Sequence, residues 1–278
     1  MKVGIVGLGL IGGSFALAIR KHRLEDKILI CERSEQSRAR ANLLGLTDGD
    51  LDARALGEID LLLLSLYPAA CAEWLGEHAH EISPHAIVVD CAGIKREICE
   101  VGAELSARYG FRFVGGHPMA GREVWGLASA TVTLFSGASM ILTPAPDVDI
   151  ATLSELKTYF REIGFGRVTV STPEDHDRII AYTSQLAHVL SSAYISSPTA
   201  EERRGFSAGS FRDMTRVAAI NAEMWSEILL SNRDFLLPEI DRLTERLSEF
   251  RETIGAADRE RLAEMLRDGA ERKKKYGS

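Results

Sequence analysis

Residues 1–32, MKVGIVGLGLIGGSFALAIRKHRLEDKILICE, contain the pattern that decides the fold of this chain. An apolar run at 3–6 leads into a G-x-G-x-x-G turn at residues 7–12, followed by a helical apolar stretch at 15–19. A second apolar run at 28–31 ends at Glu32. This succession of strand, glycine turn, helix and strand predicts a βαβ unit that binds a dinucleotide.

Each position of the turn has a physical task. Gly7 permits a tight turn, Gly9 lets the backbone approach a pyrophosphate, and Gly12 lets the helix pack closely on the strand. The helix begins at Leu10 and Ile11, where free N–H groups and the positive end of the helix dipole favour an anion.

The residues after the next strands predict the choice of cofactor. Glu32 follows Gly12 by twenty residues, where an acid accepts a hydrogen bond from the ribose 2′-hydroxyl of NAD. Arg33 and Ser34 are types that accept a 2′-phosphate, so they oppose Glu32. Repulsion between the Glu32 carboxylate and a 2′-phosphate outweighs an exposed contact between arginine and that phosphate, which predicts a preference for NAD. Ser65, at the end of the strand predicted at 61–66, is a further candidate for cofactor binding.

Composition limits the classes of protein. The chain has 278 residues, 45% of them hydrophobic and 26% charged, and a formal net charge of −7. The charge argues against nucleic acid or an anionic membrane as a partner, and the longest apolar run, at 59–67, is too short to span a bilayer. Four cysteines without metal-ligand spacing and the lack of a signal peptide predict a metal-free cytoplasmic protein.

The two halves of the chain differ in pattern. Short apolar strands alternate with helices in the first half, which predicts a doubly wound parallel sheet of the Rossmann type. Thr172 and Pro173 then start a helix, and apolar residues recur at helical spacing from there on. We therefore predict a dinucleotide-binding domain at 1–171 and an all-helical domain at 172–278.

His117 is the first candidate for chemistry. Ligands of a doubly wound fold bind beyond the carboxyl ends of the strands. A strand predicted at 112–114 is followed by the glycine-rich stretch 115–121, which contains His117. A histidine there is suited to act as a general acid or base, and the alternative is a loop histidine that caps a turn.

The helix that begins at Pro173 carries a second group. Ser184 and His188 are four residues apart and share one face, so they either line a pocket or belong to a helix interface. Asp177 lies about 10 Å from Ser184 along the helix, too far to touch the same small ligand. His176, in the first turn, is interpreted as structural.

An arginine in the helical half could hold a substrate carboxylate. Arg212 and Arg216 share a face, and the planar guanidinium suits a carboxylate. Asp213 is an alternative partner for Arg216. Trp225 either lines a pocket or fills the core.

These motifs together resemble the prephenate/arogenate dehydrogenases of tyrosine biosynthesis. The similarity runs from the turn at 7–14 through Gly-Gly-His-Pro-Met-Ala-Gly at 115–121 and Thr-Ser-Gln-Leu-Ala-His at 183–188 to Phe-Arg-Asp-Met-Thr-Arg at 211–216. It implies NAD-dependent oxidative decarboxylation of prephenate to 4-hydroxyphenylpyruvate. It assigns the catalytic histidine to His117, the carboxylate-binding arginine to Arg216, and the serine and histidine of the helix to Ser184 and His188. It also implies a helical dimerisation domain, and an apolar stripe from 229 to 254 agrees with a homodimer.

One position departs from the family pattern. The loop after the fourth strand usually reads D-x-x-S-x-K, with the serine reaching the ring hydroxyl of the substrate. Here Gly93 takes its place, while Lys95 is present. The substrate is either prephenate or arogenate. Glu123 would favour the ammonium group of arogenate, or it would pair with an arginine and have no effect on the substrate preference.

Two other classes compete with this interpretation. A hydroxyacid dehydrogenase or imine reductase has a similar architecture, and several such enzymes use a lysine on the long helix. Residues 173–197 contain no lysine. A dinucleotide-sensing or scaffold protein would not need His117, Ser184, His188 and Arg216 together.

Overall fold

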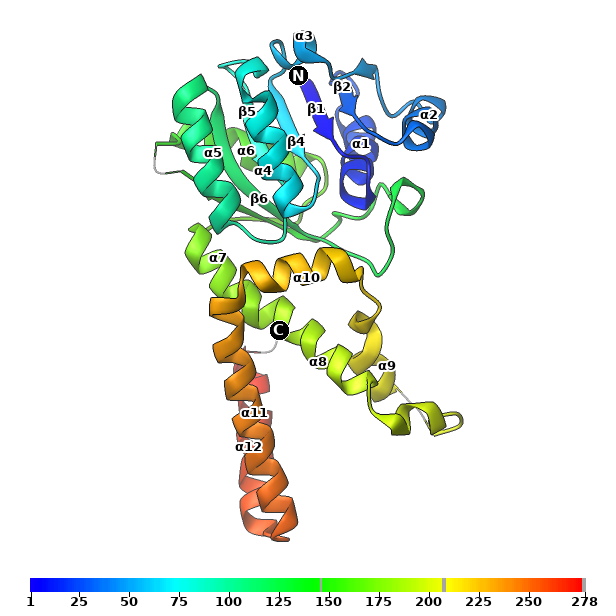
Figure 1. The fold of residues 1–278 in the computed structure, drawn as a ribbon, viewed down its shortest axis with the longest axis vertical. Helices are drawn as coiled ribbons and strands as arrows, with labels where there is room; N and C mark the ends of the chain where they lie inside the picture. Colours follow the sequence, from blue (N-terminus) through cyan, green and yellow to red (C-terminus); the bar gives the residue numbers. More distant parts are fainter. Residues whose placement is uncertain (146, 207–208, 277–278) are drawn as a thin grey trace.

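The computed structural model describes residues 1–145, 147–206 and 209–276. A sheet flanked by helices forms the first part, and helices of the second part lie along one edge of it (Figure 1). Two of these helices, α11 (Arg233–Gly255) and α12 (Arg259–Tyr276), project away from the body as a hairpin.

One eight-stranded sheet, in the order β3-β2-β1-β4-β5-β6-β7-β8, organises the first part. The first six strands follow the order expected of a dinucleotide-binding sheet, whose direction of winding reverses between β1 and β4. The strands are β1 (Lys2–Val6), β2 (Lys27–Cys31), β3 (Gly49–Asp50), β4 (Leu61–Leu64), β5 (Ile87–Asp90), β6 (Arg112–Met119), β7 (Ser139–Pro144) and β8 (Arg167–Val170).

The sheet is mixed, so the prediction of an entirely parallel sheet was wrong at one edge. β7 runs antiparallel to β6, and β8 pairs parallel with β7. The physical reason lies in the connection: a parallel neighbour requires a long crossover, usually a helix, whereas residues 120–138 contain only the short 3-10 helix η2 (Leu127–Ser129).

β6 is also longer than predicted, and His117 lies within it rather than in a following loop. The strand continues because β7 pairs with it along its length, with His117 opposite Ile141 and Met119 opposite Ser139. Gly116 permits the close approach of β5 on the other side, since an added Cβ would lie 2.4 Å from the carbonyl oxygen of Asp90 and 2.6 Å from the Val89 side chain.

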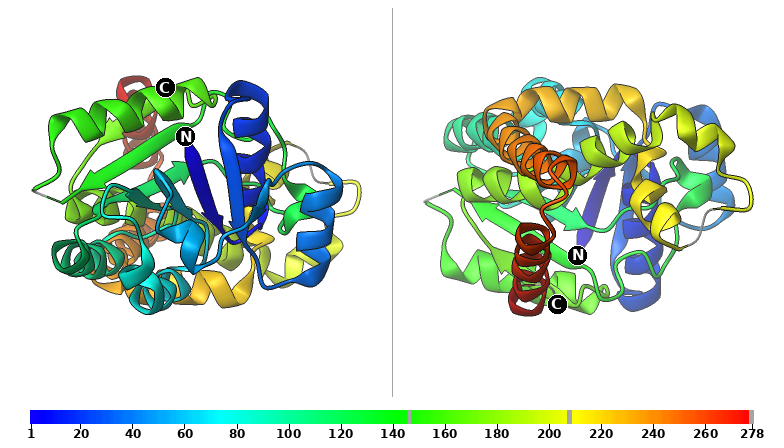
Figure 2. Two further views of the ribbon diagram at one scale, coloured as in Figure 1. Left: turned by 90° about the horizontal axis from the view of Figure 1, so that it is seen from above. Right: turned by 90° about the horizontal axis from the view of Figure 1, so that it is seen from below.

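Helices cover both faces of the sheet (Figure 2). On one face, α1 and α6 bury an aromatic cluster that includes Phe15, Phe135 and Phe160. On the other, α4 and α5 pack over the core around Leu75, Ile98 and Phe113. The helices of this part are α1 (Leu10–His22), α2 (Glu35–Leu43), α3 (Ala53–Leu56), α4 (Pro68–His78), η1 (Ala79–Glu81), α5 (Arg96–Tyr109) and α6 (Ile150–Glu162).

From Pro173 on, the described chain is helical. As expected, Thr172 caps the first helix by accepting a hydrogen bond from the amide of Asp175. The long helix is not α-helical throughout, because α7 (Pro173–Ile180) passes through a π-helical turn, η3 (Ala181–Gln185), before α8 (Leu186–Ile195). The remaining elements are η4 (Pro198–Glu202), α9 (Gly209–Thr215), η5 (Arg216–Ala218), α10 (Ala222–Ser231) and the hairpin.

A polar cluster joins the two parts. The buried side chain of Asn232 donates hydrogen bonds to the Asp177 carbonyl at 2.9 Å and to the Gln185 side chain at 2.8 Å. Its oxygen accepts a bond from Arg96, which also pairs with Asp234 at 2.6 Å. The start of α5 is thereby fixed to α7 and α11.

Within residues 1–145, 147–206 and 209–276, no helix combines the length and the apolar character that crossing a membrane requires.

Candidate active site

The glycine turn after β1 has the shape that a dinucleotide requires. Gly7 has φ +84°, a conformation that favours glycine, and a Cβ at Gly12 would lie 1.9 Å from the carbonyl oxygen of Gly7. A Cβ at Gly9 would meet nothing within 4 Å, so this side of the turn is open. Gly9 is the N-cap of α1, and the amides of Leu10 and Ile11 occupy the first turn, where N–H groups have no acceptor within the helix.

Glu32 and Ser65 flank this turn at the ends of the neighbouring strands. The Glu32 carboxylate accepts hydrogen bonds from the amides of Leu8 and Ser34, both at 2.7 Å, and each oxygen keeps a free lone pair. The buried hydroxyl of Ser65 has no partner among the described residues, and its carbonyl borders Gly7. Arg33 is exposed. An open backbone cradle, an acid and an unpartnered hydroxyl together fit a bound nucleotide.

His117 projects from the carboxyl-terminal part of β6 and contacts a second histidine. Its Nδ1 lies 2.8 Å from Nε2 of His176, and Nδ1 of His176 lies 2.7 Å from the Asp177 carboxylate. His176 and Asp177 are buried, whereas His117 is half-buried. The interpretation of His176 as merely structural therefore missed a direct contact with the candidate base.

Burial keeps this histidine uncharged. The pKa of His117 lies well below its usual value near 6.5, first because burial disfavours the imidazolium and then because His176 and the Lys95 ammonium add positive charge nearby. Lys95 is fully buried and paired with Asp90, at the end of β5. A neutral imidazole at this edge of the sheet can accept a proton.

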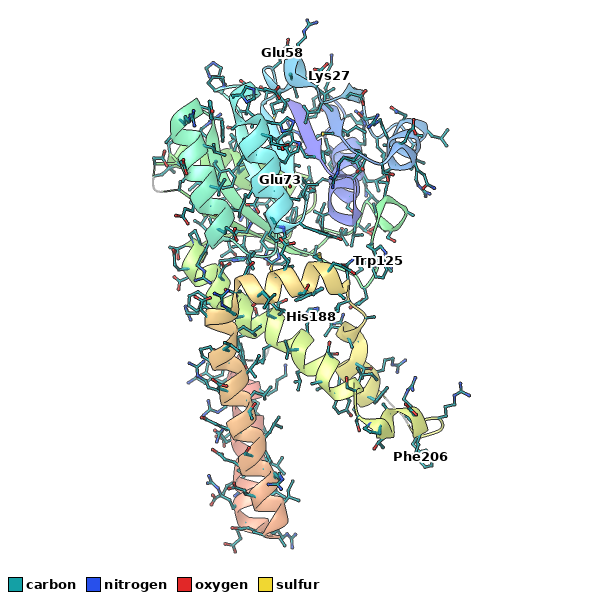
Figure 3. All side chains as sticks on the ribbon, viewed as in Figure 1. Lys27, Glu58, Glu73, Trp125, His188 and Phe206 are labelled. Carbon is teal, nitrogen blue, oxygen red and sulfur yellow. The ribbon has the colours of Figure 1, made fainter. Side chains whose placement is uncertain are left out.

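A second group lies in the helical part. The His188 ring stacks on Trp225 with 3.7 Å between ring centroids, and Figure 3 shows His188 beneath α10, the helix that carries Trp225. Nδ1 of His188 lies 2.9 Å from the carbonyl oxygen of Ser184, in the π-helical turn. The pKa of His188 is lowered by burial and by the charge of Arg216.

Arg216 is held by the loop that follows β6. Its guanidinium pairs with Glu123 at 2.5 Å, so its partner is Glu123 rather than the alternative, Asp213. The side chains are 65% and 35% exposed, respectively. Because η5 packs on α8, Arg216 lies close to His188, and six residues of chain connect Glu123 to His117.

A cleft of about 570 Å³ continues from the end of β6. Met119, Ala120 and Arg122 line one wall, and residues between Thr131 and Ala138 line the other. Ser14 of α1 accepts a hydrogen bond from the Thr131 amide at 3.1 Å, which ties this wall to the glycine turn. The cleft therefore borders the loop that carries Glu123 and a segment bonded to α1.

Sequence reasoning proposed His117 as a candidate and did not identify the residues that contact it. The structure places His117 against His176 and, separately, His188 against Ser184 and near Arg216. Asp90 and Lys95 were noted only as part of a loop after a strand. Two sequence signals pointed to these residues. Asp90 and Lys95 lie at or after the end of the same strand. His176 and Asp177 are adjacent at the start of a helix, where neither residue type is ordinarily buried.

A Rossmann-type sheet with a neutral histidine at its carboxyl edge, next to a helical second part, defines the class of nucleotide-dependent dehydrogenases with a helical domain. The chain belongs to the prephenate dehydrogenase family. The family's model of the nucleotide-binding domain matches residues 15–170, and its model of the dimerization domain matches residues 172–268.

Known proteins resemble the chain over nearly its whole length. It is 32% identical to a prephenate dehydrogenase of Bacillus subtilis, covering 95% of this chain and 75% of the relative. It is 31% identical to a cyclohexadienyl dehydrogenase of Zymomonas mobilis, over 96% and 92% of the two chains. Its fold matches the prephenate dehydrogenase of A. aeolicus solved with hydroxyphenyl propionate and NAD⁺, with a TM-score of 0.83, 29% identity and coverage of 99% and 98%.

Proposed function

We propose that the protein oxidises prephenate with NAD⁺, giving 4-hydroxyphenylpyruvate, CO₂ and NADH. The observation that carries the proposal is His117, a neutral imidazole at the carboxyl edge of the sheet, between the glycine turn and the helical domain. The names of the relatives in Bacillus subtilis and A. aeolicus support the same activity.

Residues 1–171 would hold the cofactor. The open backbone at Gly9 and the amides of Leu10 and Ile11 suit the pyrophosphate, and Glu32 and Ser65 suit the neighbouring sugar and its linkage. The nicotinamide ring of bound NAD⁺ supplies a hydride acceptor. The residues of the chain carry out the remaining steps.

His117 acts on the ring hydroxyl of the substrate. Its free imidazole nitrogen accepts the hydroxyl proton while C4 loses hydride and the ring carboxylate on C1, opposite C4, leaves as CO₂. The proton then returns to the phenolate oxygen, so the product keeps its hydroxyl. The electrons of the broken C–C bond restore aromaticity, so the site has only to orient C4 and to accept one proton. Arg216 holds a substrate carboxylate, and Ser184 and His188 line the pocket beside it.

Arogenate is the second candidate substrate. The cyclohexadienyl dehydrogenase among the relatives motivates it. Glu123 pairs with Arg216 rather than standing free, so its charge is already compensated, and this favours the keto acid over the ammonium of arogenate.

A cofactor-based assay separates these possibilities. Protein, NAD⁺ and either prephenate or arogenate are followed at 340 nm, where only the reduced cofactor absorbs. We expect a higher kcat/KM with prephenate. No reduction with either compound would favour a different dehydrogenase or a non-enzymatic nucleotide-binding protein.

His117→Gln tests the base. A lost general base lowers the rate on the order of 10²–10⁴-fold. We expect a fall in kcat of this size with an unchanged Kd for NAD⁺, measured by fluorescence titration. Wild-type turnover in this variant would remove His117 from the mechanism.

We also propose a cytoplasmic homodimer formed through residues 172–278. Among the described residues, the apolar cluster of the helical part has three buried members, Ala181, Leu186 and Leu236. In a single chain, Leu247, Ile254 and Leu266 of the hairpin are exposed to solvent. The match to a dimerization domain supports a partner chain there, and four free cysteines suit a reducing compartment.

A further inference from the structure

A series of hydrogen bonds starts at His117 in β6, passes through buried side chains and returns to β6. On one side, Nδ1 of His117 meets Nε2 of His176 at 2.8 Å, and Nδ1 of His176 meets Oδ1 of Asp177 at 2.7 Å. The amide of Lys95 donates to the same carboxylate oxygen at 2.8 Å. This half of the path crosses from β6 to α7 and then to the residue before α5.

The other half returns through the side chain of Lys95. Its ammonium pairs with Oδ2 of Asp90, at the end of β5. Oδ1 of Asp90 accepts a hydrogen bond at 3.1 Å from the amide of Gly116, the residue before His117. The five side chains and the peptide bond between Gly116 and His117 thus form a closed ring of contacts.

The chemistry of Asp177 fixes the direction of the bonds on the first side. An ionised carboxylate only accepts, and this one accepts from the amides of Lys95 and Arg96 and from the Arg96 guanidinium. Burial alone would raise the pKa of Asp177, but hydrogen bonds from His176 and these amides outweigh it, and the pKa is lowered. Nδ1 of His176 must therefore carry a proton to donate to it.

The same logic extends to His117. Burial lowers the pKa of His176, and its bond to Asp177 only partly offsets this, so the ring is neutral and its Nε2 is a bare acceptor. The contact with His117 is then satisfied only if Nδ1 of His117 donates. The second nitrogen of His117, Nε2, is left unprotonated.

We propose that Asp177 and Lys95 are positioning residues for His117, which close this ring so that the proton of His117 stays on Nδ1 and Nε2 is free to accept another. The proposal rests on the function proposed above, in which His117 is the base.

Lys95 has an additional, electrostatic effect. Among the described residues, His176 of α7 and Lys95 act on the charge of His117, and each is paired with a carboxylate, Asp177 of α7 and Asp90 of β5. β7, which pairs with this end of β6, has the sequence SMILTP and contributes no charge. The buried ammonium opposes a second proton on His117 and thereby extends the pH range in which the base is neutral.

The first test observes the protons in the wild-type protein without substrate. The protein is labelled with ¹⁵N-histidine, and the ring nitrogens of His117 are assigned by their loss in His117→Gln. We expect a neutral ring with the proton on Nδ1 at pH 7.5. A proton on Nε2, or a charged ring, overturns the proposal, and this result does not depend on whether the protein turns over prephenate.

The second test is Asp177→Asn. An amide has one acceptor and one donor side. The fixed donors are two from Arg96 on one side and the Lys95 amide on the other, so the oxygen is drawn towards Arg96. The NH₂ then faces the Lys95 amide and His176, which must accept at Nδ1 and donate from Nε2, so the proton of His117 moves to the wrong nitrogen. We expect kcat to fall at least about tenfold, with KM and NAD⁺ affinity changed much less.

Asp234→Asn is the matched control, because Asp234 also pairs with Arg96 at the domain junction but lies outside the ring. We expect activity near wild type. Equal losses in both variants, or none in Asp177→Asn, overturn the role of Asp177.

Lys95→Gln tests the charge. The amide can still donate to Asp90, but the positive charge is gone. We expect the acid limb of kcat/KM to move to higher pH by at least about half a unit. If the acid limb of kcat/KM does not move, the electrostatic role of Lys95 is overturned. A full rate in His117→Gln would instead contradict the proposed function, and it would leave the assignment of the proton to Nδ1 of His117 unaffected.

Discussion

At the scale of single residues, surroundings rather than residue type decide what a histidine does. His117 and His176 are in direct contact and both are held neutral by burial. His188 is a third case, stacked on Trp225 with one nitrogen engaged by a backbone carbonyl. Only His117 lies at the edge of the sheet where ligands of this fold bind.

The lowered pKa of His117 predicts the pH dependence of the reaction. As the proposed base, His117 would work only when neutral, and burial, His176 and Lys95 move its protonation to well below pH 6.5. We therefore expect kcat/KM for prephenate to be flat from about pH 6.5 upward and to fall only at lower pH. Rates are measured in constant-ionic-strength buffers, with blanks that correct for spontaneous loss of substrate. An acid limb centred at or above pH 6.5 would contradict this assignment.

Glu32 predicts the choice between the two nicotinamide cofactors. Its carboxylate would repel a 2′-phosphate by about 1–4 kcal/mol at 4 Å, whereas the exposed Arg33 returns about 1 kcal/mol. We expect NAD⁺ to be preferred over NADP⁺ at least about tenfold in kcat/KM, and Glu32→Ser to narrow or invert the preference.

The structure adds a control for this experiment. Glu32 also binds the amides of Leu8 and Ser34, so Glu32→Ser disturbs the turn as well as the charge. Glu32→Gln keeps one acceptor oxygen and removes the charge, and it should shift the preference in the same direction. Equal use of both cofactors by the wild type would show that Arg33 governs the site.

At the scale of elements, β6 matters more than its length suggests. It lies between the parallel part of the sheet and the antiparallel β7, and it carries His117. Its two glycines let neighbouring strands approach closely: a Cβ at Gly115 would lie 2.2 Å from the Thr143 side chain of β7. The position of the base therefore depends on two residues that have no side chain.

Gly116→Ala tests this dependence. The added methyl would lie 2.4 Å from the Asp90 carbonyl and 2.7 Å from Met140, and backbone cannot yield as a flexible side chain can. Overpacking of this kind costs about 1–3 kcal/mol. We expect a loss of unfolding free energy of that size in urea titrations and reduced activity.

Gly121→Ala is the matched comparison, because a Cβ there meets nothing within 4 Å. We expect its unfolding free energy to stay near that of the wild type. Equal stability of the two alanine variants would show that β6 can shift without cost.

At the scale of the whole molecule, the two parts differ in how much they bury. The sheet lies between two extensive apolar cores, whereas the described residues of the helical part form a small cluster around Leu186 and Leu236. α12 consists of described residues only, and none of them is buried. Phe206, 92% exposed, marks the far end of the helical part (Figure 3).

The proposed homodimer would cover exposed apolar residues of the helical part, and it can be tested by mass. Light scattering at micromolar concentration should give twice the chain mass of 30.5 kDa. Leu247 and Ile254 lie seven residues apart on α11 and are 55% and 61% exposed, so the double variant Leu247→Glu, Ile254→Glu should lower the mass towards that of one chain. Glu252→Gln on the same helix is the control. A wild-type mass near 30 kDa would contradict the dimer.

What the sequence by itself determined is local or periodic. The glycine turn with Glu32, the strand–helix alternation and the capped helix at Thr172 were predicted because each depends on neighbouring residues or on the spacing of apolar ones. His117 was found for the same reason, since glycines mark its strand end.

Only the tertiary structure decided what surrounds that histidine. His117 meets His176 across 59 residues, and the Lys95 amide meets Asp177 across 82, through packing that no local pattern specifies. The antiparallel β7 and the π-helical turn likewise depend on how distant segments fit together. The sequence identified the candidate base, but the proton it carries depends on buried groups from three other elements, whose mutual distances exist only in the folded chain.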